Sequence, residues 1–487
     1  MKLMEKFADQ VIASGTYEPL DRIYVLNKIR GFVGDEDVEA KDDEPVVSQL
    51  VDLAVKRGKI DDGQTAKEIL NDQLYDLMTP TPSVVNHKFW EKYQQSPSTA
   101  TDWFYNLCTS NDYVKVAAIK KNVVFDKPTK YGNLEITINL SKPEKDPKAI
   151  AAAAHDTAKK YPQCALCMEN EGYKGRLGQA ARSNHRIIRI TVGGQQWGFQ
   201  YSPHAYFHEH CIFLDSKHEP MKINRQTLIN LVEIEKKFPD YFVGSNADLP
   251  IVGGSMLAHE HYQGGKHIFP MMKASIKKEL HFAEYPAVDA GIVNWPMSDI
   301  RLTSADTTQL IDLGTHIIDV WDHYSDESLD IKAFDGDTRH HTVTPIMHRD
   351  GEKFVLDLVL RDNNTSDKYP LGIFHPHEKL WHIKKENIGL IEVMGLAVLP
   401  ARLREELELL KEYILEKKDI SSNEKIKKHA DWVAEFLPQY ASVTEENITE
   451  ILQAEVGKVF VKVLEDAGVY KCTPEGRAAF MRFLNTL

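Results

Sequence analysis

Three side chains near the middle of the chain have types and spacing that suit transfer of a phosphoryl-linked group. His259, His261 and Gln263 alternate with Glu260 and Tyr262, so in an extended strand the first three would point to one face. An imidazole with its ordinary pKa of about 6.5 is largely neutral and nucleophilic near pH 7. If its other nitrogen donates to a backbone carbonyl, the ring is held in one tautomer. The row can therefore hold an attacking imidazole, orient it and bind phosphoryl oxygens.

The sequence around this row decides whether the spacing is more than coincidence. With 20 His in 487 residues, a His-x-His pair is expected about 0.8 times by composition alone. A lone pair of this kind more often consists of surface histidines or satisfied core histidines. Here Gly253, Gly254 and Ser255 precede the row and can present N–H and hydroxyl groups to a diphosphate. This context, with Gln263 after the histidines, favours the functional interpretation.

Cys164 and Cys167 form a Cys-x-x-Cys pair that can bind a metal ion from one tight turn. With 5 Cys in the chain, such a pair is expected only about 0.05 times by chance. His218 and His259 are candidates for two further zinc ligands. A pair of small buried residues or a redox pair remains an alternative, although a thioredoxin-like setting fits poorly. A closed four-ligand zinc site would be structural and would fix the strand that carries His261.

The elements that must position these residues alternate between strands and helices. Residues 134–140 and 186–192 alternate apolar and polar side chains, as half-buried strands do. Residues 225–238 have helical periodicity and are stopped by Pro239, and residues 148–160 are also expected to be helical. Strand, strand, helix and strand, joined by turns suited to antiparallel pairing, predict an α+β unit and not a doubly wound parallel sheet.

Residues after about 290 loosely repeat this order of strands and helices. A strand is expected at 354–360, followed by a second aromatic and histidine segment at 372–377 and a strand-like stretch at 383–395. Residues 1 to about 125 and residues from 401 onward show the three- and four-residue apolar spacing of helices. The N-terminal helices are expected to serve docking or dimerisation.

Composition excludes several classes of function. The formal net charge is −13 and there is no long Lys/Arg block, which disfavours a sequence-independent nucleic-acid binder. The N-terminus has no apolar core of signal-peptide length, and no apolar run approaches the roughly 18–20 residues that span a bilayer. The odd number of cysteines without framework-like spacing indicates reduced thiols. We therefore expect a cytoplasmic enzyme with no membrane association.

These motifs together resemble a known family. Cys-x-x-Cys, the segment Phe-Leu-Asp-Ser-Lys-His at 213–218, Phe242 to Asn246, and Gly-Gly-Ser followed by His-Glu-His-Tyr-Gln are similar to galactose-1-phosphate uridylyltransferase of the second, bacterial class. The similarity runs along nearly the whole chain, including residues 131–150, 340–346 and 383–403. This family is a branch of the histidine-triad superfamily with Gln in place of the third His. The first class has Pro between its histidines, so Glu260 and Tyr262 are departures, but they would lie on the opposite strand face.

The resemblance implies a fold class and an activity. The fold would be α+β, with two histidine-triad-like halves at 131–290 and 291–400, mainly antiparallel sheet, and helical regions at 1–130 and 401–487. His261 would attack the α-phosphorus of UDP-glucose, expel glucose-1-phosphate and become uridylylated. Galactose-1-phosphate would then take the uridylyl group and leave as UDP-galactose, a ping-pong cycle through a covalent intermediate.

The resemblance also implies roles for individual residues. Gln263 would hydrogen-bond a phosphoryl oxygen, and Asn246 and Ser255 would help bind the nucleotide phosphates. Lys385 would offset phosphate charge and Glu392 would bind a sugar hydroxyl. The four candidate zinc ligands, Cys164, Cys167, His218 and His259, fall where the first class has its zinc ligands. His375 and His377 resemble a strand that helps bind a second metal there, but its carboxylate partner has no match, so a second metal is not expected.

Two other functions stay open at this point. A histidine-triad phosphorylase or hydrolase of dinucleoside polyphosphates would use the same His261 but hand the nucleotidyl group to phosphate or water. A zinc-stabilised nucleotide-binding module without catalysis would leave the histidine row idle. Gln263 favours the transferase, because a sugar phosphate leaves as a stable anion and needs little proton donation. In the first class a homodimer shares the active site, and a homodimer is the assembly that the resemblance suggests.

Overall fold

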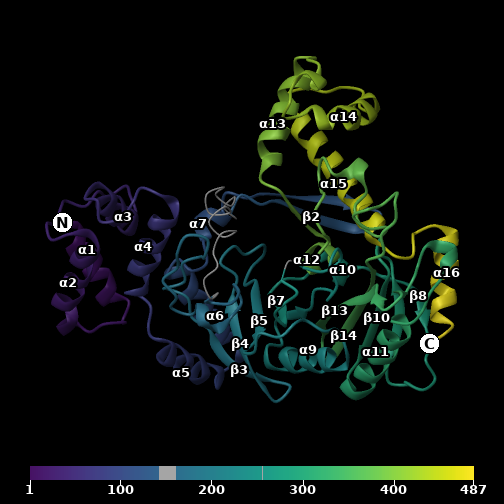
Figure 1. Ribbon diagram of the computed structural model, residues 1–487, viewed down its shortest axis with the longest axis horizontal. Helices are drawn as coiled ribbons and strands as arrows, with labels where there is room; N and C mark the ends of the chain where they lie inside the picture. Colours follow the sequence, from purple (N-terminus) through teal and green to yellow (C-terminus); the bar gives the residue numbers. More distant parts are fainter. Residues whose placement is uncertain (142–160, 255) are drawn as a thin grey trace. The chain divides into compact units, whose positions relative to one another are not determined.

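The computed structural model describes residues 1–141, 161–254 and 256–487 (Figure 1). The expected helix at 148–160 and Ser255 lie outside the described residues. The chain divides into two units. The first comprises Met1–Ala117, Pro143–Ala205 and Cys211–Glu219, and the second comprises Ala118–Lys142, Tyr206–His210 and Pro220–Leu487.

The N-terminal part of the first unit is helical, as its apolar spacing predicts. The helices are α1 (Leu3–Ala13), α2 (Arg22–Val33), α3 (Val46–Lys56), α4 (Gln64–Asp76), α5 (Pro82–Tyr93) and α6 (Pro97–Ser110). The first four bury their apolar faces in one core that runs in sequence from Leu3 to Leu77. Proline occupies the first position of α5 and of α6, and the Ser96 hydroxyl accepts the Thr99 N–H to cap α6.

The first unit also contains three antiparallel strands. They pair in the order β3 (Ile188–Val192), β4 (Gln195–Tyr201) and β5 (Cys211–Asp215). Gly193 and Gly194 connect β3 to β4, and both have positive φ, which is the conformation that a two-residue hairpin turn requires. The alternating burial along β3 matches the half-buried strand expected at 186–192.

The second unit carries the segment with the histidine row. Its strands pair antiparallel in the order β7 (His261–Gly265), β6 (Phe242–Gly244), β13 (His341–Asp350), β14 (Lys353–Asp362), β10 (Asp299–Ser304), β9 (Asp289–Val293) and β8 (Ile276–Leu280). Helices α9 (Arg225–Lys237) and α11 (Thr307–Trp321) pack against β13 and β14 on one face (Figure 1). The expectation of an α+β fold with mainly antiparallel sheet is confirmed.

A smaller sheet of the second unit joins distant parts of the chain. β1 (Val123–Thr129) and β2 (Gly132–Ile138) form an antiparallel pair, and β15 (Leu396–Leu399) adds parallel to β2. The stretch 383–395, expected to be strand-like, instead contains the short helix α12 (Leu390–Val393). The strand expectation is wrong because the first N–H groups of this helix find side-chain acceptors, Glu392 for Gly389 and Asn246 for Leu390.

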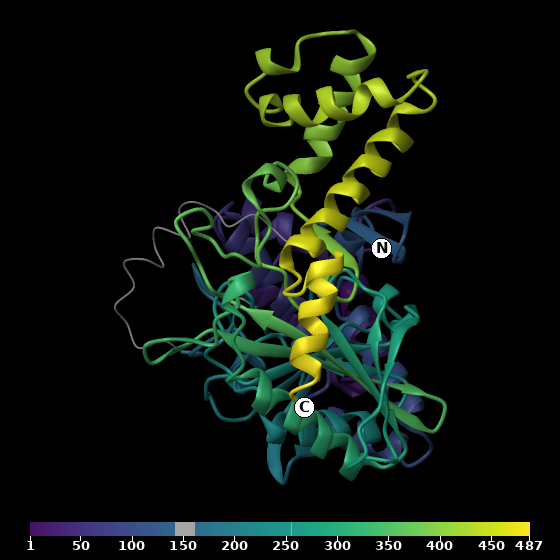
Figure 2. The ribbon, with the colours of Figure 1, turned by 90° about the vertical axis from the view of Figure 1, so that its right-hand side faces the viewer.

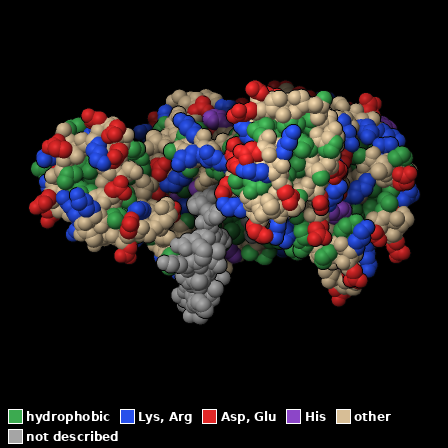
Figure 3. Space-filling view, turned by 90° about the horizontal axis from the view of Figure 1, so that it is seen from above, with side chains coloured by type: hydrophobic (Ala, Val, Ile, Leu, Met, Phe, Trp, Pro, Cys, Tyr) green, Lys and Arg blue, Asp and Glu red, His purple; other side chains and the backbone are tan. Residues whose placement is uncertain are grey.

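The C-terminal part of the second unit is helical. It contains α13 (Arg402–Leu415), α14 (Ala430–Phe436), α15 (Ile448–Ala467) and α16 (Pro474–Leu484). In Figures 1 and 2, α15 runs from the small sheet towards α14. None of the described helices combines the length and apolar character needed to cross a bilayer. On the face shown in Figure 3, acidic and basic side chains of the described residues are interspersed.

Candidate active site and metal cluster

His261 is the first residue of β7, and its ring is buried with one nitrogen free to react. Its Nδ1 lies 2.7 Å from the carbonyl oxygen of His259. Because a carbonyl can only accept, Nδ1 carries the proton and Nε2 keeps its lone pair. Burial lowers the pKa of His261 to about 4, so the ring is neutral at pH 7. This is the protonation state that a nucleophilic imidazole needs.

Gln263 lies two residues further along β7, so its side chain shares a face with that of His261. Its Oε1 lies 2.9 Å from Nε2 of His210, a buried residue that precedes β5. The NH₂ group of Gln263 is therefore turned away from His210. Sequence reasoning did not single out His210, although it closes a second His-x-His pair with His208.

Of the two departures from the first-class motif, Tyr262 lies on the other face of β7 and Glu260 directly precedes the strand. The Tyr262 hydroxyl donates to Glu260 Oε1 at 2.7 Å and accepts from the amide of Asn230 on α9 at 3.0 Å. These contacts tie the back of the strand to the helix. The reactive face is left to His261 and Gln263.

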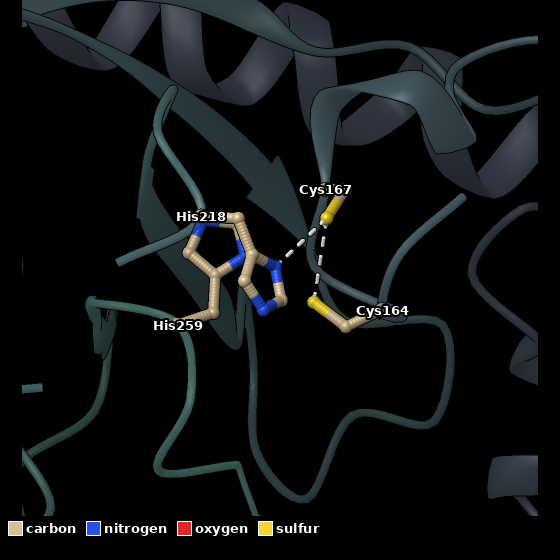
Figure 4. Close-up of side chains that lie close together, drawn as sticks. All are labelled: Cys164, Cys167, His218 and His259. Atoms are coloured by element: carbon tan, nitrogen blue, oxygen red, sulfur yellow. Dashed lines mark hydrogen bonds between the residues drawn. The ribbon is translucent and has the colours of Figure 1, made fainter. Parts of the chain in front are cut away.

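The four candidate metal ligands come together in the structure. The ligand atoms of Cys164, Cys167, His218 and His259 all lie within 4.8 Å of one another, and their side chains point toward a common centre (Figure 4). The two sulfur atoms are 3.5 Å apart, and Cys167 Sγ is 3.2 Å from His218 Nδ1. Tetrahedral zinc, with Zn–S of about 2.3 Å and Zn–N of about 2.0–2.1 Å, needs ligand separations of roughly 3.3–3.8 Å. The donor set therefore fits zinc.

Hydrogen bonds from one side chain hold the turn that carries the two cysteines. The amide of Asn170 donates to the carbonyls of both Cys164 and Cys167, at 2.8 Å each. Neither cysteine is in a disulfide, and burial raises the pKa of Cys167 to about 11. A buried thiol of this kind becomes a thiolate only beside a compensating cation. A bound metal ion would supply that charge.

The glycine-rich loop before the row packs tightly on Asn246. A Cβ on Gly254 would lie 2.7 Å from Asn246 Nδ2, and one on Gly253 would lie 2.4 Å from the carbonyl of Ala247. The lack of a side chain thus lets Gly253 approach the backbone of Ala247, and Gly254 the side chain of Asn246, this closely. Asn246 is buried and accepts the Leu390 N–H at 2.9 Å, so its oxygen already caps α12.

Glu392 and Lys385, both expected at the substrate, have different surroundings. Glu392 is buried and forms an ion pair with Lys384, which is itself buried. Lys385 is exposed, and its ammonium lies 4.8 Å from the centre of the Trp381 ring. The structure thus places Lys384, which the sequence argument did not single out, beside Glu392.

Arg361 on β14 is a second buried cation that sequence reasoning missed. It is 1% exposed, and its guanidinium donates to the Thr344 hydroxyl at 3.2 Å and to the Ile388 carbonyl at 2.9 Å. Burial lowers its pKa to about 10, which still leaves it charged at pH 7. The registers of β14, β13, β6 and β7 place Arg361 on the same sheet face as Gln263. Arg361 lies at the end of the largely apolar strand β14, where the sequence pattern indicates a core strand and no binding residue.

His375 and His377, which were considered as ligands of a second metal, contact side chains of the protein itself. His375 Nε2 lies 3.3 Å from Asn387 Oδ1, and His377 Nδ1 lies 3.3 Å from Asp466 Oδ2. His377 also stacks on Tyr369, with ring centres 4.1 Å apart.

Two family models match the chain over most of its length. The model for the galactose-1-phosphate uridyl transferase N-terminal domain matches residues 15–220, and the model for the C-terminal domain matches residues 233–433.

Curated relatives match the chain from end to end. It is 64% identical to the galactose-1-phosphate uridylyltransferase of Lactobacillus helveticus, covering 100% of this chain and 99% of that protein. The enzyme of the same name from Pediococcus pentosaceus is 58% identical, with 100% of both chains covered. Among solved structures, yeast Ap4A phosphorylase Apa2 is 11% identical with a TM-score of 0.38, covering 69% of this chain and 95% of that chain.

Proposed function

Because the chain belongs to the galactose-1-phosphate uridylyltransferase family, a family of nucleotidyltransferases, we propose that it moves a uridylyl group from UDP-glucose to galactose-1-phosphate. The observation that carries the mechanism is the hydrogen bond from His261 Nδ1 to the His259 carbonyl. It leaves Nε2 as a buried, neutral nucleophile next to an amide that can bind phosphoryl oxygens.

The reaction divides into two displacements at phosphorus. In the first, the Nε2 lone pair of His261 forms a bond to the α-phosphorus of UDP-glucose, and the bond to the glucose-1-phosphate oxygen breaks. Glucose-1-phosphate leaves as an anion and takes the electron pair, so no general acid is required. In the second, a phosphate oxygen of galactose-1-phosphate attacks the same phosphorus, and His261 leaves in its original neutral form.

The residues around His261 bind charge without donating a proton. The NH₂ group of Gln263 would hydrogen-bond a phosphoryl oxygen as negative charge builds on it. Asn246 and Ser255 would contact the nucleotide phosphates. Glu392 would bind a sugar hydroxyl, and Lys385 was expected to offset phosphate charge. Lys384, and not Lys385, is the lysine that forms an ion pair with Glu392. We therefore assign the positive charge that offsets the phosphate to Lys384.

A zinc ion held by Cys164, Cys167, His218 and His259 would be structural. Four protein ligands close the coordination shell and leave no position for water. Through His259, such an ion would fix the residue whose carbonyl sets the tautomer of His261.

The covalent intermediate gives a direct test. The protein is incubated with UDP-glucose alone, its intact mass is measured, and galactose-1-phosphate is then added. We expect a mass increase of one uridylyl group, lost on addition of the sugar phosphate with release of UDP-galactose. His261→Gly should give no adduct, whereas His281→Gly, a matched change at an exposed histidine, should behave as wild type.

The same experiment separates the alternatives. An adduct that only water discharges would favour a hydrolase, and one that inorganic phosphate discharges would favour a phosphorylase. If the wild-type protein binds UDP-glucose but its mass never changes, the covalent mechanism is wrong.

A further inference from the structure

Among the described residues, the side chain of His210 makes one hydrogen bond, and its partner is Gln263. Its Nε2 lies 2.9 Å from Gln263 Oε1. An amide oxygen can only accept, so His210 carries its proton on Nε2. The ring is 3% exposed, and burial lowers its pKa to about 4, so it is neutral. Its Nδ1 has no hydrogen-bond partner among the described residues.

The segment Tyr206–His210 holds this ring in place. The ring centres of Phe207 and Tyr206 lie 4.6 Å and 5.4 Å from that of His210. Glu209 adopts a left-handed φ of 56°, and its buried carboxylate accepts a hydrogen bond from the Tyr241 hydroxyl. A non-glycine residue keeps such a backbone only where the surroundings enforce it. His210 is therefore held by the residues that directly precede it in the sequence.

Strand β7 passes directly against this segment. A Cβ on Gly265 would lie 2.7 Å from the Glu209 carbonyl oxygen. The absence of a side chain at Gly265 thus allows the strand to approach closely enough for Gln263 to reach His210. The contact between the two residues is built by the backbone as well as by the side chains.

The orientation of the Gln263 amide follows from this contact. With Oε1 on His210, the NH₂ group is the part of the amide available to a phosphoryl oxygen. A flipped amide would bring an N–H against the N–H of His210 and would turn an oxygen towards phosphoryl oxygens. The other tautomer of His210 could accept from a flipped amide, but it would bury an N–H at Nδ1 without an acceptor among the described residues.

We propose that His210 is a positioning residue that locks the Gln263 amide with its NH₂ group towards the reacting phosphorus. The role rests on the proposed function, because it matters only if a phosphoryl group is transferred at His261. Since His210 would act through Gln263 and not on substrate, it should affect the rate of uridylyl transfer more than the affinity for UDP-glucose.

Two substitutions of His210 test this in a single-turnover assay of adduct formation. His210→Phe keeps an aromatic ring but removes the donor, and we expect it to slow adduct formation about 10- to 100-fold. This is less than the roughly 100- to 1,000-fold lost when an oxyanion donor itself is removed, because Gln263 remains in place. Dissociation of UDP-glucose should change little. His210→Gln places an amide N–H near the position of Nε2 and should restore most of the rate. Far-UV circular dichroism and thermal melting confirm that both variants fold.

A double-mutant cycle distinguishes positioning from a general structural effect. Gln263→Met removes the amide while keeping the length of the side chain. If His210 acts through Gln263, adding His210→Phe to Gln263→Met should slow the reaction less than about twofold further. Full additivity of the two effects would overturn the proposal, and so would a His210→Phe enzyme as fast as wild type.

The protonated nitrogen of the His210 ring can be identified by NMR without any substrate. In protein with ¹⁵N-labelled histidine, the His210 signals, identified by their loss in His210→Phe, should be those of a neutral ring protonated at Nε2. Protonation at Nδ1 would overturn the proposal. A wild-type enzyme that forms no adduct would overturn the proposed function and, with it, the catalytic use of this bond, whereas an unaffected His210→Phe enzyme would overturn only the role of His210.

Discussion

A buried histidine can react only if one ring nitrogen remains free. His341 is fully buried, stacks on Trp321 with ring centres 4.0 Å apart, and engages both nitrogens, one with the Trp321 carbonyl at 2.8 Å and one with Asp362 at 3.1 Å. His261 has a single bond, to a backbone carbonyl, and keeps Nε2 available. Of two histidines of similar burial, His341 is therefore committed to the core, whereas His261 keeps a nitrogen for the chemistry proposed for it.

His382 and His429 form a chain of hydrogen bonds that predicts a pH dependence of stability. His429 Nε2 donates to Glu406 at 3.0 Å, and the Nδ1 atoms of the two rings are 2.8 Å apart, so His382 donates to His429. Burial lowers the pKa of His382 to about 3, from about 6.5 in the unfolded chain. Between these values the unfolded chain binds a proton that the folded protein does not. Stability should therefore be complete above about pH 6.5 and fall with decreasing pH, by up to about 1.4 kcal/mol per pH unit.

Urea unfolding between pH 7 and pH 4.5 measures this loss. His382→Asn keeps a donor near the position of Nδ1 but does not titrate, so its stability should decline less steeply over this range than that of wild type. Identical slopes for the two proteins would show that His382 is not responsible.

At single positions, the sequence reveals residues whose partners are near in the chain. His261 and Gln263 were recognisable because alternation along one strand places them together, and Cys164 and Cys167 because they share one turn. His210 lies 53 residues from Gln263, and no local pattern connects them. Lys384 and Lys385 are adjacent and chemically alike, and only packing decides that Lys384 is the buried one.

The elements that present the proposed active residues are short and depend on contacts from elsewhere. β7 has 5 residues and α12 has 4, lengths at which intrinsic propensity decides little. Alternation of side chains was enough to predict β3, along which buried and exposed residues alternate. It failed for α12, because the acceptor for its Leu390 N–H is Asn246, 144 residues away. Local pattern thus predicts elements with an exposed face better than elements capped by tertiary contacts.

The Cys164–Cys167 turn predicts a metal dependence. Cys164→Ser replaces a soft ligand by a poor one and should lower both the bound zinc per chain and the melting temperature. Because the ion would be structural, wild-type protein treated with a strong chelator should melt earlier in the same way. Zinc content by elemental analysis, with melting curves before and after chelation, measures both effects.

Cys108→Ser is a matched control, since Cys108 is a buried free cysteine outside the cluster. It should leave the zinc content unchanged. Unaltered melting of Cys164→Ser, or a chelator that acts equally on wild type and on Cys164→Ser, would remove the structural-metal hypothesis.

At the scale of the whole molecule, the chain builds separate cores within its two units. One core is confined to α1–α4 and the residues that follow α4. Another belongs to the second unit and gathers residues far apart in sequence, including Phe242 on β6, Leu390 on α12 and Phe460 on α15. The elements around the active face and the C-terminal helices therefore share one apolar core. Helical spacing predicted the C-terminal helices, but nothing in their sequence indicates that they complete this core.

This shared core makes stability of the second unit depend on α15. Phe460 is fully buried, and Phe460→Ala should lower the free energy of unfolding by about 3–5 kcal/mol through lost burial and a cavity. Lys462, two residues later on the same helix, is exposed, so Lys462→Ala should change it by no more than about 0.5 kcal/mol. Urea unfolding followed by tryptophan fluorescence measures both. Because α15, which carries Phe460, contains none of the proposed active residues, the rate of adduct formation per folded molecule should stay within about twofold of wild type at a temperature where the variant is folded. A Phe460→Ala protein as stable as Lys462→Ala would show that α15 is peripheral to the core, and a stable but inactive one would show that the helix acts on the site itself.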